Sequence, residues 1–187
     1  MEKTEPTRDR LVVTAANLFR QKGYHGVGLA EILKQANAPK GSLYHHFPNG
    51  KPDLAIAAAD WASAGMLAIV DDAFRDATSF QDGATTLCFK LAKFFDLSNK
   101  WDGCPVTHVL FDGPGNDAFR DHANTIFDAW IAQTAAHGIR LGIAPDKAEH
   151  LAETLLIAIQ GTWVMARARR SSDVIRQIPD RLFLQSA

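Results

Sequence analysis

Hydrophobic residues recur at the three- and four-residue spacing of an α-helix along most of this chain. In the first such segment Leu11, Ala15, Leu18 and Phe19 fall on one face. The whole pattern predicts helices at residues 7–22, 29–36, 40–46, 51–73, 80–99, 106–111, 117–137, 145–169 and 172–184. We therefore expect an all-α protein with about nine helices.

Three of these helices lie within the first 50 residues, a long one followed by two short ones. Only residues 37–39 separate the two short helices, and this arrangement is the helix-turn-helix pattern. Pro39 fits the first position of the third helix, where its missing N–H is no loss. Pro48 ends that helix, because the residue before a proline disfavours helical geometry.

The third helix carries two kinds of side chain. Leu43 and Phe47 lie four residues apart and can anchor one face inward. A short helix with cationic and hydroxyl groups outward is a plausible reader of a DNA groove. The outward groups are Lys40, Ser42, Tyr44 and His45. Arg8 and Arg10, at the start of the first helix, are expected to be exposed beside this surface.

The helix expected at residues 145–169 contains five consecutive apolar residues, 155–159, and is therefore apolar on every side. Such a helix must be covered on opposite faces. Gly161 would allow another helix to approach closely. We expect the last two helices to form a subunit interface. The alternative is a central helix buried in a monomer.

Composition describes an ordinary folded protein, with 187 residues, 47% hydrophobic residues and a net charge of −1. The first 60 residues hold 8 Lys and Arg against 6 Asp and Glu, whereas the remainder holds 12 against 15. A net positive charge in the first 60 residues and a net negative charge in the remainder fit an N-terminal part that faces DNA. Two cysteines fit a reducing cytosol. No uninterrupted apolar stretch is long enough to span a bilayer, so we expect a cytoplasmic protein without a membrane partner.

Residues 19–54 resemble the N-terminal DNA-binding domain of the TetR family of transcriptional regulators. The form Ala-Pro-Lys-Gly-Ser-Leu-Tyr-His-His-Phe at residues 38–47, and Gly-Cys-Pro-Val at residues 103–106, are most similar to the LmrA/YxaF-like branch. The matching residues are Phe19, Gly23, Tyr24, Gly26, Leu29, Ile32, Ala36, Lys40, Gly41, Ser42, Leu43, Tyr44, His46, Phe47, Lys51 and Leu54. Two positions depart from the family pattern: Gly28 replaces a Ser or Thr, and Asn37 replaces a glycine.

The resemblance implies a helix-turn-helix domain over residues 1–50 and a helical ligand-binding and dimerisation domain over residues 51–187. It further implies a repressor that binds a pseudo-palindromic double-stranded operator as a homodimer. Lys40 and Lys51 would neutralise phosphates, and Tyr44 and His46 would bond the DNA backbone. Ser42 and His45 are the candidates for base contacts.

Aromatic residues of the second half suit a small apolar or aromatic effector. The expected pocket residues are Phe89, Phe94, Trp101, His108, Phe111, Phe127, Trp130 and Trp163, with His108, Asn124 and Gln160 as polar anchors. The alternative for each individual aromatic residue is that it packs in the core and does not line a pocket.

Two other readings remain open. Oxidation of Cys104 could act as a redox switch, although an inert buried thiol is the simpler expectation. His108 and His122 could approach each other and, with Asp112 or Asp121, mimic the metal site of a helical enzyme. Since the chain carries no known catalytic motif, we expect no enzyme, no metal and no cofactor.

Overall fold

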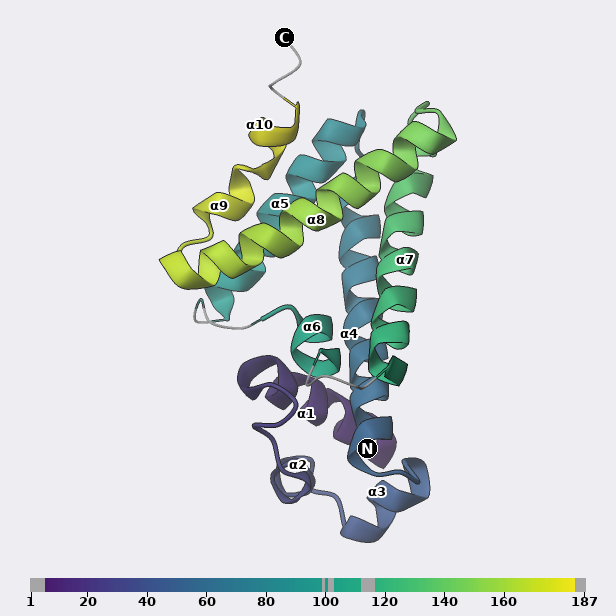
Figure 1. Cartoon of the computed structure of the whole chain (residues 1–187), viewed down its shortest axis with the longest axis vertical. Helices are drawn as coiled ribbons and strands as arrows, with labels where there is room; N and C mark the ends of the chain where they lie inside the picture. Colours follow the sequence, from purple (N-terminus) through teal and green to yellow (C-terminus); the bar gives the residue numbers. More distant parts are fainter. Residues whose placement is uncertain (1–5, 99, 101–102, 112–116, 184–187) are drawn as a thin grey trace, which may run out of the picture. The chain divides into compact units, whose positions relative to one another are not determined.

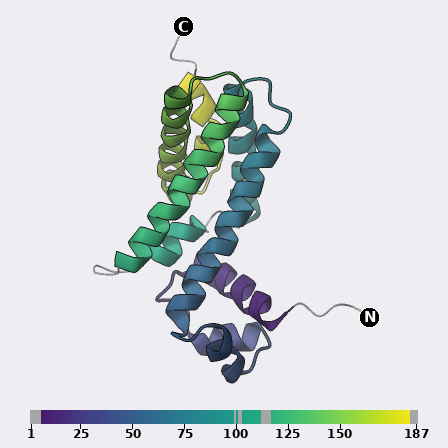
Figure 2. The ribbon, with the colours of Figure 1, turned by 90° about the vertical axis from the view of Figure 1, so that its right-hand side faces the viewer.

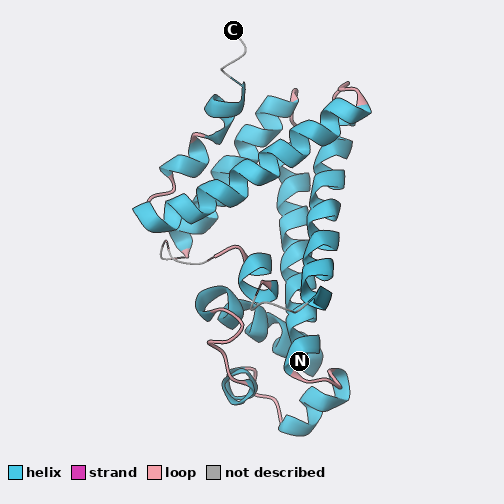
Figure 3. Ribbon diagram, in the orientation of Figure 1, coloured by secondary structure: helices cyan, strands magenta, loops and turns pink. Residues whose placement is uncertain are grey.

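The computed structural model describes residues 6–98, 100, 103–111 and 117–183, and these residues form helices joined by loops (Figure 1, Figure 3). The helices are α1 (Thr7–Lys22), α2 (Leu29–Gln35), α3 (Lys40–His46), α4 (Lys51–Phe74), α5 (Phe80–Leu97), α6 (Pro105–Leu110), α7 (Asp117–Arg140), α8 (Pro145–Arg169), α9 (Asp173–Arg176) and α10 (Ile178–Phe183). Each segment expected from the hydrophobic pattern contains helix within the described residues, and the all-α prediction is confirmed.

The last expected helix is the one that differs in form. The hydrophobic pattern predicts a single helix over residues 172–184, whereas the described part is split at Gln177 into α9 and α10. Pro179 explains the break, because a proline has no N–H to donate and its ring collides with the carbonyl four residues earlier. That carbonyl belongs to Ile175, which lies in α9.

The chain divides into two compact units that are not consecutive in sequence. The first unit contains residues 1–64 and 104–124, and the second contains residues 65–103 and 125–187. Helix α4 runs without interruption across residues 51–74 and contributes to both units. The functional division at residue 50 therefore stays a prediction, and the two units are described separately below.

In the first unit, α1 supplies the centre of a small core. Leu11 and Phe19 of α1, Ile32 of α2, Leu43 of α3 and Leu54 of α4 are fully buried. Each of the four helices thus places an apolar residue inside the same unit, which fixes α3 against α1.

Helix α6 and the start of α7 also belong to this first unit. The backbone N–H of Tyr24 donates to the carbonyl of His108 at 3.2 Å. The Tyr24 ring meets Phe119 of α7 edge to face, with centroids 5.6 Å apart. Asp60 of α4 accepts a hydrogen bond from His122 of α7 at 2.7 Å.

In the second unit, α4 and α7 run side by side in the same direction (Figure 2). Gln133 donates to the carbonyl of Leu67 at 3.1 Å, and Arg140 donates to that of Phe74 at 2.6 Å. Between them the His137 ring bonds the Asp71 carboxylate at 2.8 Å, and this hydrogen bond lowers the pKa of Asp71. These bonds hold the two helices in one register.

Close packing around Phe74 requires a glycine on α5. A Cβ at Gly83 would lie only 2.3 Å from the Phe74 ring, so no side chain fits there unless the ring moves. On its other sides the Phe74 ring stacks on His137 at 5.2 Å and meets Phe80 at 5.4 Å. Phe74 therefore joins α4, α5 and α7 in the core of this unit.

Length and composition alone would allow α4 to cross a membrane, although Asp60 and Asp71 interrupt its apolar sequence. One such helix is weak evidence, because the core helix of a soluble protein passes the same test. Asp60 and Asp71 of α4 both bond histidines of α7. Those contacts fit a helix inside a folded protein.

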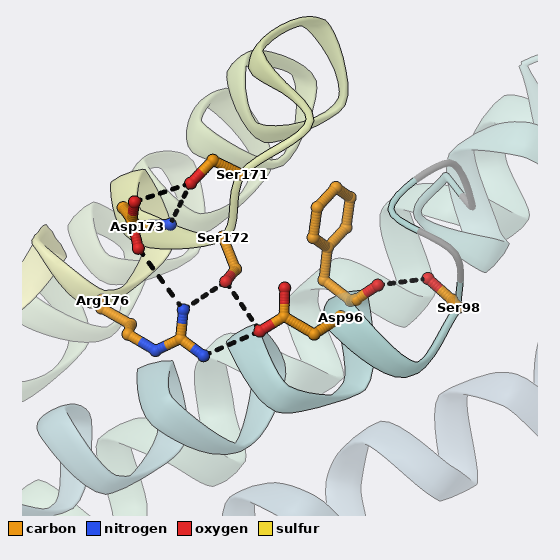
Figure 4. A network of polar contacts seen from close by, with 7 residues as sticks. Asp96, Ser98, Ser171, Ser172, Asp173 and Arg176 are labelled. Atoms are coloured by element: carbon orange, nitrogen blue, oxygen red, sulfur yellow. Dashed lines mark hydrogen bonds and ion pairs between the residues drawn. The ribbon is translucent and has the colours of Figure 1, made fainter.

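A polar network connects α9 to α5 (Figure 4). The Asp96 carboxylate of α5 accepts hydrogen bonds from Arg176 at 2.8 Å and from the Ser172 hydroxyl at 2.9 Å. Arg176 also contacts Ser172 and lies 3.7 Å from Asp173. The hydrogen bond from Arg176 is the main reason that the pKa of Asp96 is lowered.

This network predicts a stability that depends on pH. A carboxyl whose pKa is lowered by folding stabilises the fold above its ordinary value of about 3.9 and loses that contribution as pH falls through the lowered pKa. We expect Asp96→Asn to reduce the free energy of unfolding in urea by about 1 kcal/mol near neutral pH. The difference from wild type should shrink in strong acid. The control is Asp180→Asn, which replaces an exposed carboxylate of α10. An Asp96→Asn effect that is the same at both pH values would contradict the prediction.

Candidate DNA-binding interface

Helix α3 is short, and its ends are defined by local features. Pro39 is the N-cap residue with an extended backbone, one position earlier than expected from the sequence. The Ser42 hydroxyl donates to the Pro39 carbonyl at 2.7 Å and closes the first turn. At the other end the Phe47 N–H donates to the carbonyl of Leu43 at 2.7 Å. The buried side chains of Leu43 and Phe47 anchor the helix, as expected.

The polar side chains of α3 lie on the surface. Lys40, Tyr44 and His45 are exposed, with 45% of Tyr44 accessible to solvent, and Ser42 and His46 are half-buried. An exposed lysine can neutralise a phosphate, and a tyrosine hydroxyl can bond the DNA backbone. The arrangement therefore allows the contacts predicted for this helix.

Ser42 is more restricted than the sequence suggests. A serine hydroxyl has one hydrogen to donate and two lone pairs that can accept. Because that hydrogen is directed at the Pro39 carbonyl, Ser42 can meet a DNA base as an acceptor without breaking its own bond. The amino groups of adenine and cytosine are the donors that the major groove offers.

The ring of Tyr44 lies against the turn that precedes α4. A Cβ at Gly50 would lie 3.3 Å from the Tyr44 ring, and Gly50 has φ +73°, a conformation that side chains rarely adopt. Next to it, Asp53 accepts from the backbone N–H of Asn49 at 2.9 Å and from its side-chain amide at 3.1 Å. This turn supports Tyr44 and fixes the beginning of α4.

Lys51, at the beginning of α4, lies close to two aromatic rings of the first unit. Its ammonium group is 4.1 Å from the centroid of the Tyr24 ring and 6.0 Å from that of Phe19. A lysine over an aromatic face is held by a cation–π interaction. Lys51 therefore has an internal partner, and its contact with phosphate stays a prediction.

Arg10 differs from the expectation that both arginines at the start of α1 are exposed. Arg8 is exposed, and its guanidinium lies 5.8 Å from the Phe47 ring. Arg10 is partly buried and donates to the backbone carbonyls of Ala36 and Asn37. The partners are 26 and 27 residues apart in sequence, so no local pattern could have indicated the contact.

The predicted effector residues form separate groups. His108, Phe111 and Asn124 belong to the first unit, Phe89, Phe94, Phe127, Trp130, Gln160 and Trp163 belong to the second, and Trp101 lies outside the described residues. In the second unit the rings of Phe94 and Trp163 are 6.4 Å apart, and those of Phe127 and Trp130 are 5.5 Å apart. Their role in binding an effector stays a prediction.

The two cysteines are both buried. Burial raises the pKa of the Cys88 thiol to about 12, which keeps it protonated and unreactive. Cys104 lies just before α6 in the first unit and is 9% exposed. Burial of this kind does not favour the redox reading.

Among the residues that the structure describes, no group of three His, Cys, Asp or Glu could hold a metal ion. His122, one of the two histidines considered for a metal, bonds Asp60 instead. Asp112, which could have completed that site, lies outside the described residues.

The fold and the exposed α3 define a helix-turn-helix DNA-binding protein. Residues 11–58 match the family model of bacterial regulatory proteins of the tetR family, and residues 81–181 match that of the LmrA/YxaF-like C-terminal domain of transcriptional regulators. The chain therefore belongs to the TetR family of DNA-binding transcriptional regulators, with a C-terminal domain of the LmrA/YxaF-like type. This membership confirms the resemblance and the expectation of a protein that is not an enzyme.

Individual relatives agree with this assignment. An uncharacterized HTH-type transcriptional regulator of Mycobacterium tuberculosis is 32% identical over 173 residues, which cover 87% of this chain and 85% of the relative. The transcriptional repressor NemR of Escherichia coli is 51% identical over 41 residues, 22% of this chain and 21% of NemR. CifR, a TetR family regulator solved as a cysteine mutant with 26-base-pair double-stranded operator DNA, has a similar fold. Its TM-score is 0.75 at 23% identity, covering 92% of this chain and 93% of that one.

The exposed side chains of α3 lead to a direct test. We expect the double variant Lys40→Ala, Tyr44→Ala to bind operator DNA at least tenfold more weakly in a gel shift, because it removes one phosphate contact and one backbone hydrogen bond. The matched control is Lys147→Ala, Glu149→Ala, which replaces two exposed residues of α8. Unchanged operator affinity of the α3 variant would reject the assignment of this helix.

Proposed function

We propose that this protein is a homodimeric repressor that a small apolar or aromatic effector releases from a pseudo-palindromic operator. It would act in the cytoplasm, where double-stranded operator DNA is its partner. The observation that carries the proposal is the exposed recognition helix α3 in a family of DNA-binding regulators. The name of NemR, a repressor, supports repression as the direction of the effect.

An apolar stripe on α8 supports the dimer. Leu155, Ile159 and Trp163 are buried in their own unit. Ile157 and Val164 are 65% and 67% exposed, although both are large apolar residues. Residues seven apart lie on one side of a helix, so these two form a stripe that faces away from the core.

Gly161 and Met165 lie along the same stripe. Met165 is 38% exposed, and a Cβ at Gly161 would have no neighbour within 4 Å. A glycine at this place leaves room for another helix, and a second copy of α8 is the partner that the resemblance implies. A two-fold dimer would present two α3 helices about 34 Å apart, in successive major grooves. An operator with two-fold related half-sites would match that spacing.

Aromatic contacts in the second unit support an apolar effector. The pairs Phe94 with Trp163 and Phe127 with Trp130 offer ring faces and edges from α5, α7 and α8. An effector releases DNA only if it binds the DNA-free form more tightly, and a hundredfold preference corresponds to about 2.7 kcal/mol of coupling. Helix α4 begins beside α3 and continues into the second unit, so it is the element proposed to transmit this coupling.

The proposed role of the α8 stripe in dimerisation can be tested by introducing charged residues into it. We expect the double variant Ile157→Glu, Val164→Glu to sediment as a monomer, because buried carboxylates would face each other across the interface. Its operator affinity should fall by several orders of magnitude, since each monomer holds only one half-site. The control Leu97→Glu replaces a residue of α5 that is 76% exposed and should remain dimeric. A dimeric double variant with normal helicity would place the interface elsewhere.

The effector can be identified once the operator sequence is known. Selection from random DNA gives the operator, and a library of small apolar and aromatic compounds is then screened for its release. We expect an active compound to weaken operator binding about a hundredfold, and Trp163→Phe or Trp130→Phe to change its affinity. Peroxide treatment is the parallel arm, and it should leave operator binding unchanged. Release by peroxide that Cys104→Ser abolishes would support the redox reading instead.

A further inference from the structure

Arg10 connects α1 to the turn between α2 and α3. Its Nε donates to the carbonyl of Ala36 at 3.1 Å, and its Nη2 donates to the carbonyl of Asn37 at 3.3 Å. The same Nη2 reaches the Thr7 hydroxyl at 3.4 Å. Three of the five N–H donors of the guanidinium are therefore directed at acceptors inside the protein.

The turn has a defined form that leaves these carbonyls in need of a donor. Asn37 adopts a left-handed conformation with φ +48°. The Ala38 N–H donates to the Leu33 carbonyl at 3.0 Å, and the Asn37 N–H donates to that of Lys34 at 3.3 Å. These two bonds are those of a Schellman motif at the end of α2. They satisfy carbonyls within α2 but not those of the turn itself, which Arg10 bonds.

The turn sets the direction in which α3 leaves α2. Only Ala38 and Pro39 separate Asn37 from the first residue of α3. With a rise of about 1.5 Å per residue, the seven residues of α3 extend roughly 10 Å from this turn. A small rotation at Asn37 therefore displaces Tyr44 and His45, near the far end of the helix, by much more than it displaces the turn.

We propose that Arg10 is a positioning residue for operator recognition. It holds the carbonyls of Ala36 and Asn37 and so sets the angle of α3, without itself contacting DNA. The proposal rests on the DNA binding that family membership establishes, not on the effector or the dimer. Base contacts depend on precise placement of side chains, whereas attraction to phosphates tolerates displacement. Loss of Arg10 should therefore affect operator DNA more than unrelated DNA.

The experiment compares two Arg10 variants with two matched controls. Arg10→Gln removes the charge and the fork of donors, and Arg10→Lys keeps the charge without the planar geometry that reaches two carbonyls. Arg20→Gln removes the same charge from the last turn of α1. Lys40→Gln removes a predicted phosphate contact from α3. The probes are the duplex selected by the wild-type protein and an unrelated duplex of equal length, each measured over a salt series.

We expect both Arg10 variants to bind the selected duplex at least tenfold more weakly and the unrelated duplex as well as wild type does. The slope of log K against log salt should not change for Arg10→Gln. Lys40→Gln should instead weaken both duplexes and reduce the slope by about 1. Arg20→Gln measures the effect of charge loss alone on α1.

Three results would overturn the proposal. A slope reduced by about 1 in Arg10→Gln, with both duplexes weakened, would make Arg10 a phosphate contact. Unchanged affinity for the selected duplex would leave it without a role in recognition. Loss of helical circular dichroism at the assay temperature in both Arg10 variants would make the contact one of general stability.

Discussion

A seven-residue helix is not stable on its own in water, and the DNA-binding surface proposed for α3 depends on contacts that stabilise this helix. Burial of Leu43 and Phe47 supplies the main force, at about 1.5–3 kcal/mol for each fully buried side chain. The two residues lie four apart, so they fix both the position and the rotation of α3. The outward direction of Lys40 and Tyr44 follows from that rotation. The surface proposed for DNA recognition therefore depends on the core of the first unit.

Electrostatic attraction to DNA phosphates is weaker for this protein than for strongly basic DNA-binding proteins. The net charge is −1, and the first 60 residues exceed neutrality by only two positive charges. Lys51 lies over the Tyr24 ring, and Arg10 donates hydrogen bonds to the turn between α2 and α3. Two of the eight Lys and Arg residues in this part of the chain therefore also stabilise the fold. A surface with few cations cannot bind strongly through phosphates alone. In the proposed dimer, precise placement of two α3 helices would then supply more of the affinity.

The helices could be predicted because their causes are local. Periodic apolar residues and the prolines near α3 are visible in the sequence, and α1, α3 and α8 have the bounds expected from them. The break at Gln177 also has a local cause, Pro179, although the apolar spacing over residues 172–184 is that of one continuous helix. The residue types on α3 were also predictable, since anchoring at positions 43 and 47 decides which side chains face outward.

Contacts between distant residues could not be predicted in the same way. Arg10 bonds a carbonyl 26 residues away, and His137 bonds Asp71 across 66 residues. Neither pair has a spacing that indicates contact, because the approach is created by packing of whole helices. The contact of the Lys51 ammonium group with the Tyr24 ring has the same origin, because it joins α4 to a residue that lies 27 positions earlier in the sequence.

The turn between α2 and α3 depends both on its local sequence and on a contact with a distant residue. The TetR family usually has glycine at position 37, the residue that adopts positive φ at least cost. Asn37 adopts φ +48° instead, and asparagine tolerates this conformation better than most residues. Because asparagine has fewer conformations than glycine in the unfolded chain, ordering the turn loses less entropy. With the Schellman bonds and Arg10 added, the turn is held by its own sequence and by its neighbour, and α3 has correspondingly less freedom to change its angle.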